Sequence, residues 1–289
     1  MWRLQFFPFP PTLVSMYHSQ FLLSAALALS ISGCGGGTGF QPTVTGVKPE
    51  TLQYGKSATI LLGGKDLRSN MVVDTNGACI NPSFASNSTT DTLVLNCTVK
   101  SAGNFTLTIK TEAGVVVNTT TLTVPNPQVG ILTSLGSIVM ELDPTAAPIT
   151  VNNFLSYANS GFYSNTLFHR VMSGFVIQGG GYTTGMVKKE GQKDPIVLES
   201  NNGLSNLRGT VAMARTNVPD SATSEFFINH VDNLFLNYST TSAGYAVFGK
   251  VVQGMDVVDA IAAKATGMLN GEKSLPLDEI TITGAFQIK

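Results

Sequence analysis

The sequence predicts a mainly β protein, in which a β-sandwich precedes an antiparallel sheet or barrel that is covered by two helices. Charged residues make up only 12% of the 289 residues, about half the usual share, which argues against a long helical bundle. Short segments that alternate between apolar and polar side chains, separated by turns, fill residues 42–124. Beyond residue 127, two isolated helical patterns lie among strand-like segments and loops.

The first segment of the chain is typical of an exported protein. Residues 21–31, FLLSAALALSI, form an apolar core that is too short to span a bilayer in the mature protein. The core leads into Ile31-Ser32-Gly33-Cys34, which resembles the bacterial lipoprotein cleavage box, where the cysteine becomes the lipidated first residue. We therefore predict a signal peptide over residues 1–33, lipidation of Cys34 and a flexible tether over residues 34–41.

Lipidation would anchor the mature protein to a membrane surface without spanning it. Gly35 stands where an Asp retains some lipoproteins in the inner membrane. We therefore expect a periplasm-facing lipoprotein of the bacterial cell envelope, with the outer membrane favoured over the inner one. Two alternatives stay open: an ordinary secretory cleavage site with an incidental cysteine, and a start at Met16 in place of Met1. The net charge of −1 does not provide the excess of positive charge that is typical of nucleic-acid-binding proteins.

The two cysteines of the following region suit an oxidising compartment. Cys97 alternates in phase with Leu93 and Leu95 and is predicted to face inward, whereas Cys79 follows a turn signal. A disulfide between Cys79 and Cys97 would stabilise the fold by about 3 kcal/mol, and two unpaired buried thiols are the alternative. The sequence has no CxxC pair and no clustered histidines, so no metal site is predicted.

Residues 42–124 are predicted to form the β-sandwich. Ser57–Leu62 stops at a pair of glycines, and Asp91–Val99 alternates between apolar and polar side chains. The run Val44–Leu67 opens with the pattern Val-x-x-Val-x-Pro and resembles the start of TIG-type immunoglobulin-like domains. The resemblance implies a spacer or adhesive module. We expect a spacer because the sequence of this region shows no group of residues suited to catalysis.

Pro125-Asn126-Pro127 indicates a linker to a second domain. Beyond this linker we expect a hairpin over residues 130–142. A helix follows, with Pro148 near its start, and its apolar face consists of Val151, Phe154, Leu155 and Ala158. A second helix is expected over residues 256–264, and its apolar side consists of Val257, Val258, Ile261 and Ala262.

Four motifs of the second domain follow one another in order: NSGFYSNTLFHRVMSGFVIQGGG, NNGLSNLRGTVAMAR, SATSEFFIN and GYAVFGKVVQGMDVVDAI. Together they resemble a cyclophilin-type peptidyl-prolyl isomerase of the bacterial periplasmic kind, and we place this domain at residues 128–289. The resemblance implies an eight-stranded antiparallel barrel closed by two helices, with the substrate groove on its outer face. It implies a monomer that needs no cofactor and binds unfolded or exposed polypeptide segments containing proline.

The resemblance also implies the site residues. Arg170, in Phe168-His169-Arg170, matches the catalytic arginine of the family. The substrate-binding positions are Phe175, Val176, Gln178, Ala214, Arg215, Glu225, Phe227, Phe235, Leu236 and Tyr245. Phe235 stands where many eukaryotic members have Trp, which implies weak cyclosporin binding, and Tyr245 stands where many of them have His.

The chemistry of proline isomerisation explains why such residues suit this function. An X–Pro bond rotates slowly because amide resonance is lost on twisting, and the twisted proline nitrogen regains a lone pair. An enzyme therefore needs an apolar cup for the ring and a cationic donor beside it. Arg170 stays protonated at every relevant pH, and Phe175, Phe227 and Leu236 supply the cup. The alternative for Arg170 is a solvated arginine without a role.

One site residue departs from the family pattern. Glu225 stands where the family usually has Gln, and a carboxylate accepts hydrogen bonds but donates none at neutral pH. Pairing with Arg170 would compete with the substrate carbonyl, whereas pairing with Arg215 would reshape the edge of the groove. We expect an active but altered enzyme. His169 is predicted to be structural, and His230 is predicted to be a loop residue.

The sequence thus predicts a peptidyl-prolyl cis-trans isomerase that assists folding of envelope or secreted proteins. One alternative is a chaperone that binds proline-containing peptides with little turnover, which Glu225 alone favours. Another is an adhesion or scaffolding protein led by residues 42–124.

Overall fold

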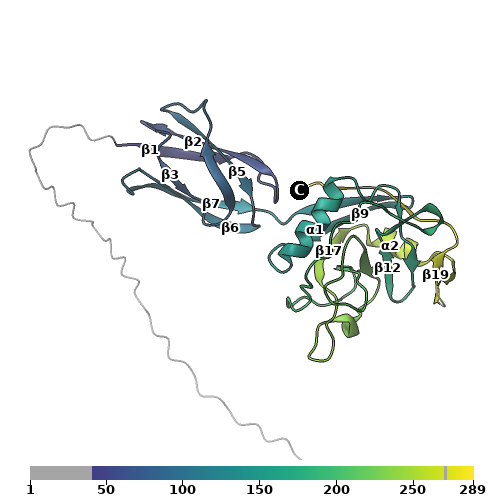
Figure 1. Ribbon diagram of the computed structural model, residues 1–289. Coiled ribbons are helices and arrows are strands. Elements are labelled where there is room, and N and C mark those ends of the chain that lie inside the picture. Colours follow the sequence, from purple (N-terminus) through teal and green to yellow (C-terminus); the bar gives the residue numbers. More distant parts are fainter. Residues whose placement is uncertain (1–40, 270–271) are drawn as a thin grey trace, which may run out of the picture. The chain divides into compact units, whose positions relative to one another are not determined.

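The computed structural model describes residues 41–269 and 272–289 of a mainly β chain (Figure 1). One group of strands, β1 to β7, precedes residue 125, and a second group, β8 to β20, follows it together with both α-helices. The predicted fold class is confirmed. The predicted signal peptide and Cys34 lie outside the described residues.

Two antiparallel sheets make up the β-sandwich that the alternating pattern predicts. The first has the strand order β1-β2-β5-β4, and the second has the order β3-β6-β7. The bounds are β1 (Thr43–Pro49), β2 (Ser57–Lys65), β3 (Val72–Asp74), β4 (Cys79–Phe84), β5 (Thr92–Val99), β6 (Gly103–Lys110) and β7 (Val116–Val124). Alternate side chains of both sheets share one core, which includes Ile60, Leu62, Leu93, Leu95, Leu107 and Ile109.

A disulfide joins Cys79 of β4 to Cys97 of β5, and the two Cα atoms are 5.6 Å apart. In the antiparallel pairing Cys79 lies opposite Val99, so the two cysteines are diagonal neighbours on adjacent strands. Both side chains are buried, and Cys97 faces the sandwich core together with Leu93 and Leu95. The predicted disulfide and the predicted direction of Cys97 are confirmed.

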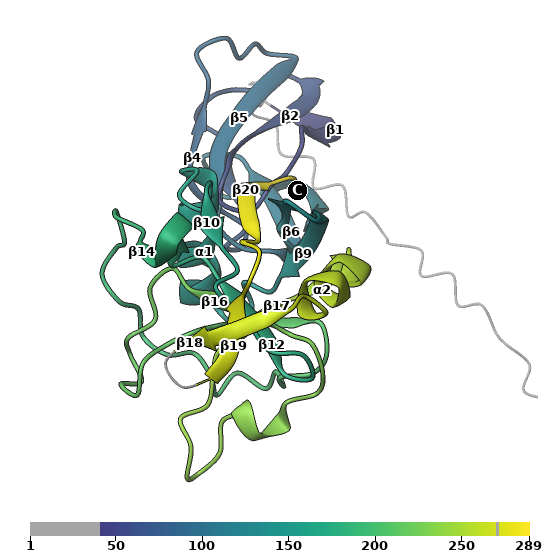
Figure 2. The same ribbon diagram turned by 90° about the vertical axis from the view of Figure 1, so that its right-hand side faces the viewer.

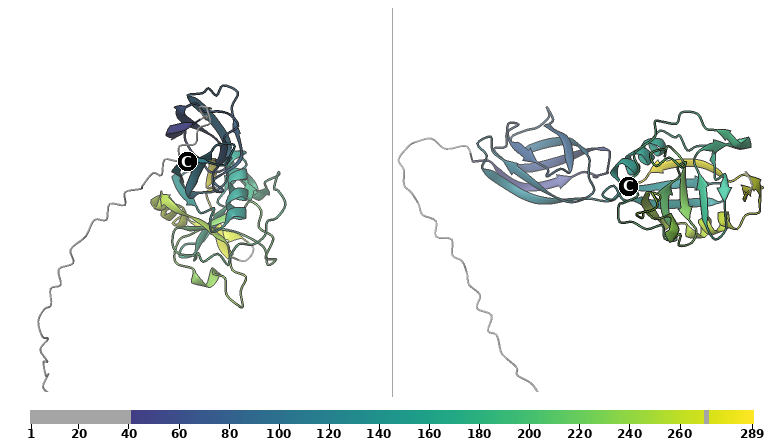
Figure 3. Two further views of the ribbon diagram at one scale, coloured as in Figure 1. Left: turned by 90° about the vertical axis from the view of Figure 1, so that its left-hand side faces the viewer. Right: turned by 60° about the horizontal axis from the view of Figure 1, so that its bottom comes forward.

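The strands after residue 127 form one curved antiparallel sheet in the order β10-β20-β8-β9-β17-β15-β16-β12-β11 (Figures 2 and 3). Its members are β8 (Gln128–Thr133), β9 (Gly136–Leu142), β10 (Thr166–Leu167), β11 (Arg170–Val171), β12 (Val176–Gly179), β15 (Thr210–Met213), β16 (Phe226–Asn229), β17 (Val247–Gln253) and β20 (Thr281–Gln287). Two small pairs lie beside it, β13 (Tyr182–Thr183) with β14 (Val187–Lys188), and β18 (Thr266–Leu269) with β19 (Glu272–Pro276).

The sheet closes on itself, as the order of its edge strands shows. β10 and β11 stand at opposite ends of the hydrogen-bonding order, yet only Phe168 and His169 separate them along the chain. The two edges must therefore be adjacent in space. β10 and β11 act as two halves of one interrupted strand, which reconciles the nine strand segments with the eight strands that were expected.

Both helices pack their apolar side chains against the core inside this barrel. α1 (Pro148–Asn159) starts with a proline, whose missing N–H costs nothing in the first turn. Its predicted apolar face is buried, and α2 (Met255–Ala262) likewise buries Val258, Ile261 and Ala262. These side chains join the inward-facing residues of the strands in a single core. Within the described ranges, neither helix is long and apolar enough to cross a membrane.

Candidate active site

A small apolar cluster lies on the outer face of the barrel sheet, apart from the barrel core. Successive side chains of a strand point to opposite faces of a sheet, so Phe226 enters the core whereas Phe227 belongs to the cluster. The buried members of this outer cluster are Val176, Ala212, Ala214, Phe227 and Val247, and Phe175, Leu204, Leu236 and Tyr245 pack against them while partly exposed. The outer cluster is therefore a preformed apolar surface that stays partly open to solvent.

The register of the strands places Arg170 at one end of this surface. Arg170 of β11 lies opposite Gln178 of β12, and Gln178 lies opposite Phe227 of β16. Phe227 lies opposite Ala212 of β15, which in turn lies opposite Val247 of β17. Because directly opposite residues share a face of the sheet, these five form one row across five strands. The row begins with a cation, continues with the amide of Gln178 and ends with three apolar side chains.

Arg170 also contacts the turn that joins β11 to β12. Its guanidinium carbon lies 5.6 Å from the centre of the Phe175 ring, within the range of a cation–π contact. Phe175 stacks in turn on Phe235, with the ring centres 5.7 Å apart and the planes inclined by 15°. Phe235 belongs to the short 3-10 helix η2 (Leu234–Leu236) and is 72% exposed. The cation and two aromatic rings thus lie at the open side of the outer cluster.

Glu225 precedes β16 and contacts a histidine and a glutamine. Its Oε2 lies 3.3 Å from Nε2 of His169 and accepts a hydrogen bond of 2.9 Å from Nε2 of Gln178. Burial opposes ionisation and raises the pKa of this carboxyl, but the contacts with His169 and Gln178 outweigh it, so the pKa lies below the usual 4.5. Glu225 is therefore an ionised acceptor at neutral pH.

This geometry differs from the two pairings considered from the sequence. Within the described part of the chain, the carboxylate of Glu225 is bound by His169 and Gln178 and by neither Arg170 nor Arg215. His169 is 5% exposed and packs edge-on against Tyr182. It directly precedes Arg170 at the start of β11, so an imidazole rather than a guanidinium reaches Oε2 of Glu225 beside the amide of Gln178.

Arg215 and Tyr245 form the opposite border of the outer cluster. The guanidinium carbon of Arg215 lies 4.6 Å from the centre of the Tyr245 ring, and its Nε and Nη2 donate to the backbone oxygen of Gly244 at 2.9 and 2.8 Å. Tyr245 meets Phe227 edge-on, with ring centres 5.5 Å apart. The backbone N–H of Ala214 is already used, because it donates to the backbone oxygen of Glu225 at 2.9 Å.

Comparisons with known proteins identify the family of this second half of the chain. Residues 128–286 match the family described as cyclophilin type peptidyl-prolyl cis-trans isomerase/CLD. The chain belongs to the cyclophilin family. The peptidyl-prolyl cis-trans isomerase of Acinetobacter baylyi is 52% identical over 164 residues, which are 57% of this chain and 86% of that protein. Peptidyl-prolyl cis-trans isomerase B of Escherichia coli is 54% identical over 153 residues, 52% of this chain and 93% of that protein.

A solved structure is also similar to this cyclophilin. It is the cyclophilin type peptidyl-prolyl cis-trans isomerase of Cryptosporidium parvum, crystallised in the presence of the dipeptide Ala-Pro. The two sequences are 29% identical, the TM-score is 0.49, and the match covers 56% of this chain and 99% of the other. The family match and the bacterial relatives at about half identity show that this chain is an enzyme, a peptidyl-prolyl cis-trans isomerase.

The structure of this cyclophilin brings all the sequence-predicted groove residues into one connected set. The residues named from the motifs either belong to the outer cluster or contact a member of it or one another, as described for Arg170, Phe235, Gln178, Glu225 and Arg215. The motifs alone did not indicate three further members of the outer cluster, Leu204, Ala212 and Val247. Alternation along β15 could have predicted Ala212, whereas Val247 is recognised only through its pairing with Ala212.

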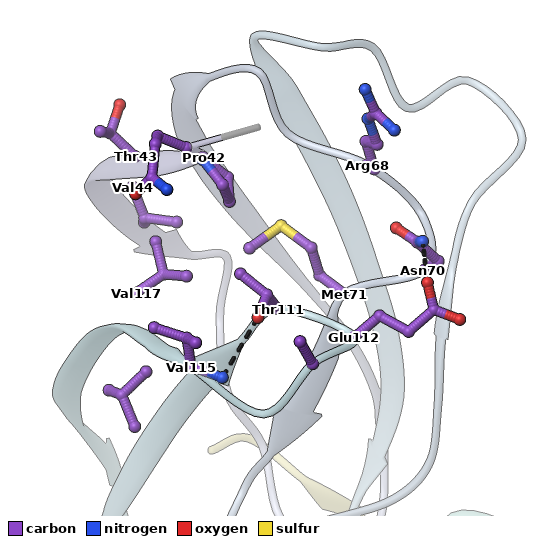
Figure 4. Close-up of a pocket in the computed structure, with 13 residues that line it drawn as sticks. Pro42, Thr43, Val44, Arg68, Asn70, Met71, Thr111, Glu112, Val115 and Val117 are labelled. Atoms are coloured by element: carbon purple, nitrogen blue, oxygen red, sulfur yellow. Dashed lines mark hydrogen bonds between the residues drawn. The ribbon is translucent and has the colours of Figure 1, made fainter. Parts of the chain in front are cut away.

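A hollow of about 900 Å³ lies on the β-sandwich (Figure 4). It is bounded by β1, by the segment before β3 and by the turn between β6 and β7. Nδ2 of Asn70 donates to Oε2 of Glu112 at 2.6 Å, and the backbone N–H of Val115 donates to Oγ1 of Thr111 at 3.1 Å. The hollow lies outside the residues that match the cyclophilin family, and we assign it no part in the isomerase site.

Proposed function

We propose that this cyclophilin isomerises X–Pro bonds in envelope or secreted proteins, and that Arg170 stabilises the twisted amide. One observation carries the mechanism: a guanidinium stands at the end of a cross-strand row whose other members are mostly apolar, beside an outer cluster that is partly open to solvent. A cation beside a dry, preformed surface interacts more strongly with developing charge than the same cation in water. The bacterial relatives are named as peptidyl-prolyl cis-trans isomerases, which supports the reaction type.

The proposed mechanism needs neither a nucleophile nor a proton transfer. The outer cluster receives the pyrrolidine ring, and the guanidinium donates to the proline carbonyl and toward the nitrogen as the bond twists. Amide resonance is lost in that state, and the nitrogen lone pair becomes an acceptor. Bringing a step of tens of seconds into the ordinary range of turnover requires about 4–6 kcal/mol of preferential stabilisation. One aimed donor in a site that excludes water supplies an amount of that order.

We propose that Gln178 binds the substrate backbone through its side-chain carbonyl oxygen, while its amide nitrogen binds Glu225. Because Nε2 of Gln178 donates to Glu225, the carbonyl oxygen of the same amide is the atom suited to accept a substrate N–H. Ala214 and Arg215 are proposed to border the bound peptide, and Leu236 and Tyr245 to complete the pocket wall.

The activity is tested by a protease-coupled assay on a tetrapeptide of the form Ala-Ala-Pro-Phe. We expect the purified chain to accelerate the slow cis-to-trans phase well above the uncatalysed rate. The competing function, a chaperone that binds proline peptides with little turnover, is favoured only by the carboxylate at position 225. Peptide binding without acceleration of the slow phase would establish that alternative and remove the proposed catalysis.

Changing Glu225 to Gln is expected to alter both activity and peptide preference. The substitution keeps the side-chain size but removes the charge that holds His169 and Gln178. Loss or exchange of one hydrogen bond in the groove changes kcat/KM by about 3- to 10-fold. The measurement compares kcat/KM on peptides that differ in the residue before proline. Unchanged values across that series would refute the expectation.

The effect of Glu225→Gln on the stability of the fold is expected to depend on pH. The pKa of Glu225 is lowered in the folded protein, so its ionised form stabilises the fold above pH 4.5, and this contribution is lost as the pH falls through the lowered pKa. Glu225→Gln is therefore expected to lower the melting temperature at neutral pH and to have less effect in acid. Glu50→Gln, at an exposed position of the β-sandwich, is the control.

The proposed setting is the bacterial cell envelope, with the protein attached to a membrane surface through a lipid on Cys34. The apolar run at residues 21–31 and the small residues before Cys34 support this setting. The immunoglobulin-like region then acts as a spacer between the anchor and the isomerase. We expect mass spectrometry of the mature protein to find an N-terminal acylated cysteine. A mature N-terminus at any other residue, or an unmodified Cys34, would contradict the anchor.

A further inference from the structure

His230 is the first residue after β16, and it makes two hydrogen bonds to the turn between β11 and β12. Its ring Nδ1 accepts the backbone N–H of Gly174 at 3.0 Å. Its own backbone N–H donates to the carbonyl oxygen of Phe175 at 2.9 Å. Two consecutive residues of the turn are thus attached to one histidine. The second of them carries the ring that contacts Arg170.

The other side of the His230 ring is attached to α2. Nε2 lies 3.2 Å from Oδ1 of Asp259, and Nη2 of Arg208 lies 2.8 Å from both oxygens of the same carboxylate. A further hydrogen bond joins Nη1 of Arg208 to the backbone oxygen of His230. Because Nδ1 acts as an acceptor and Nε2 faces a carboxylate, the hydrogen of the neutral ring is on Nε2. Asp259 and Arg208 therefore fix both the orientation and the tautomer of the imidazole.

Besides His230, two backbone hydrogen bonds and one other side chain hold the turn. Met172 N–H donates to the Val176 oxygen at 2.9 Å, Phe175 N–H donates to the Met172 oxygen at 3.0 Å, and Nδ2 of Asn233 donates to the Phe175 oxygen at 2.9 Å. β11 and β12 pair through only two residue pairs, at the edge of the hydrogen-bonding order. Ser173 and Gly174 are exposed, and Gly174 has a φ of 74°, which favours glycine. Phe175 is only partly buried, so core packing does not fix its position. The position of its ring is set by the backbone that His230 and Asn233 hold, together with the contacts of the ring with Arg170 and Phe235.

We infer that His230 is a positioning residue that holds the Gly174–Phe175 turn, and with it the Phe175 ring, against the outer cluster. The inference rests on the proposed function, since Phe175 is taken as part of the apolar cup. His230 itself touches no substrate in this scheme. The turn is held by Nδ1, which accepts the hydrogen bond from Gly174, whereas Nε2 orients the ring through Asp259.

Two substitutions separate the two ring nitrogens. In His230→Asn the side-chain oxygen can occupy the place of Nδ1 and still accept from Gly174. In His230→Gln the amide reaches the place of Nε2, so the contact with Asp259 is kept and the acceptor for Gly174 is lost. We expect KM to rise about 5- to 10-fold in the Gln variant with kcat nearly unchanged, because the cup binds ground and transition states alike. The Asn variant is expected to stay within about twofold of the wild type.

Equal KM values in both variants, whether at the wild-type level or raised together, would overturn the inference. Either result would mean that KM does not depend on the atom that accepts the hydrogen bond from Gly174. A measurement on the unmutated protein is independent of activity: nitrogen-15 NMR is expected to show a coupling through the hydrogen bond between the Gly174 amide and Nδ1 of His230. Absence of that coupling would also overturn it. Failure of the proposed function appears differently, as a wild-type protein no faster than Arg170→Ala.

Discussion

Replacing Arg170 with alanine is expected to lower kcat/KM by about 100- to 1,000-fold, the cost of removing one donor aimed at a transition state. The guanidinium carbon lies 5.6 Å from the Phe175 ring and begins the row that continues through Gln178 and Phe227. Alanine leaves the apolar cup in place but removes the group that favours the twisted amide over either planar form. The substrate still enters the pocket, so the loss is expected in kcat more than in KM.

The fold is expected to tolerate this substitution. Arg170 is partly exposed and lies at the edge of the hydrogen-bonding order, outside the barrel core. The protease-coupled assay measures the activity, and circular dichroism checks that the variant is folded.

Two further variants make the test specific for the guanidinium. Arg170→Lys keeps the charge but loses the planar fork of donors, and intermediate activity is expected. Arg68→Ala, at an exposed position of the β-sandwich outside the family match, controls for removal of an arginine as such. An Arg170→Ala variant as active as the wild type would contradict the proposed mechanism.

Replacing Phe226 with alanine is expected to lower the free energy of unfolding of the barrel by about 3–5 kcal/mol, the usual cost of deleting a buried aromatic ring. Phe226 is completely buried. Its ring meets those of Phe154, Tyr163 and Phe168 nearly at right angles, with centres 5.4, 5.6 and 5.9 Å apart. These edge-to-face contacts join β16 to α1 and to the strand end before Arg170, so the surroundings cannot collapse easily into the space left behind.

Phe227 is the matched control, because it is the next residue on the same strand but faces the outer cluster. Phe227→Leu keeps an apolar side chain of similar volume, so the stability cost is expected to stay below about 1.5 kcal/mol. Its activity should fall because the flat wall of the pocket is lost. Urea unfolding followed by near-ultraviolet circular dichroism, together with the isomerase assay, measures both effects. If the two variants lost stability equally, the assignment of the two faces of β16 would be wrong.

The β-sandwich, the two helices and the inward direction of Cys97 could be anticipated because each depends on a local pattern. Alternation along β5 determines which face Cys97 occupies, and the spacing of Val151, Phe154 and Ala158 determines which side of α1 is buried. The motif around Arg170 likewise predicted a site whose members the structure places together. Such patterns specify the direction of a side chain relative to its own element.

The contacts of Glu225 and His230 show what such patterns leave open. The sequence offered Arg170 and Arg215 as partners for Glu225, but the structure pairs it with His169 and Gln178. His230, expected to be a loop residue, holds the turn 56 residues earlier in the chain. Neither partner could be read from spacing, because both depend on which strand ends lie side by side.

By itself, the amino-acid sequence predicted the fold class, the inward direction of Cys97, the apolar faces and, through its motifs, a set of groove residues. Only the tertiary structure decided the closure of the barrel, the partner of the unusual glutamate and the attachment of the Phe175 turn to α2 through His230. The physical reason is that hydrophobic periodicity acts within one element over a few residues. A hydrogen-bond partner is instead chosen by distance, after strand register has brought remote segments together.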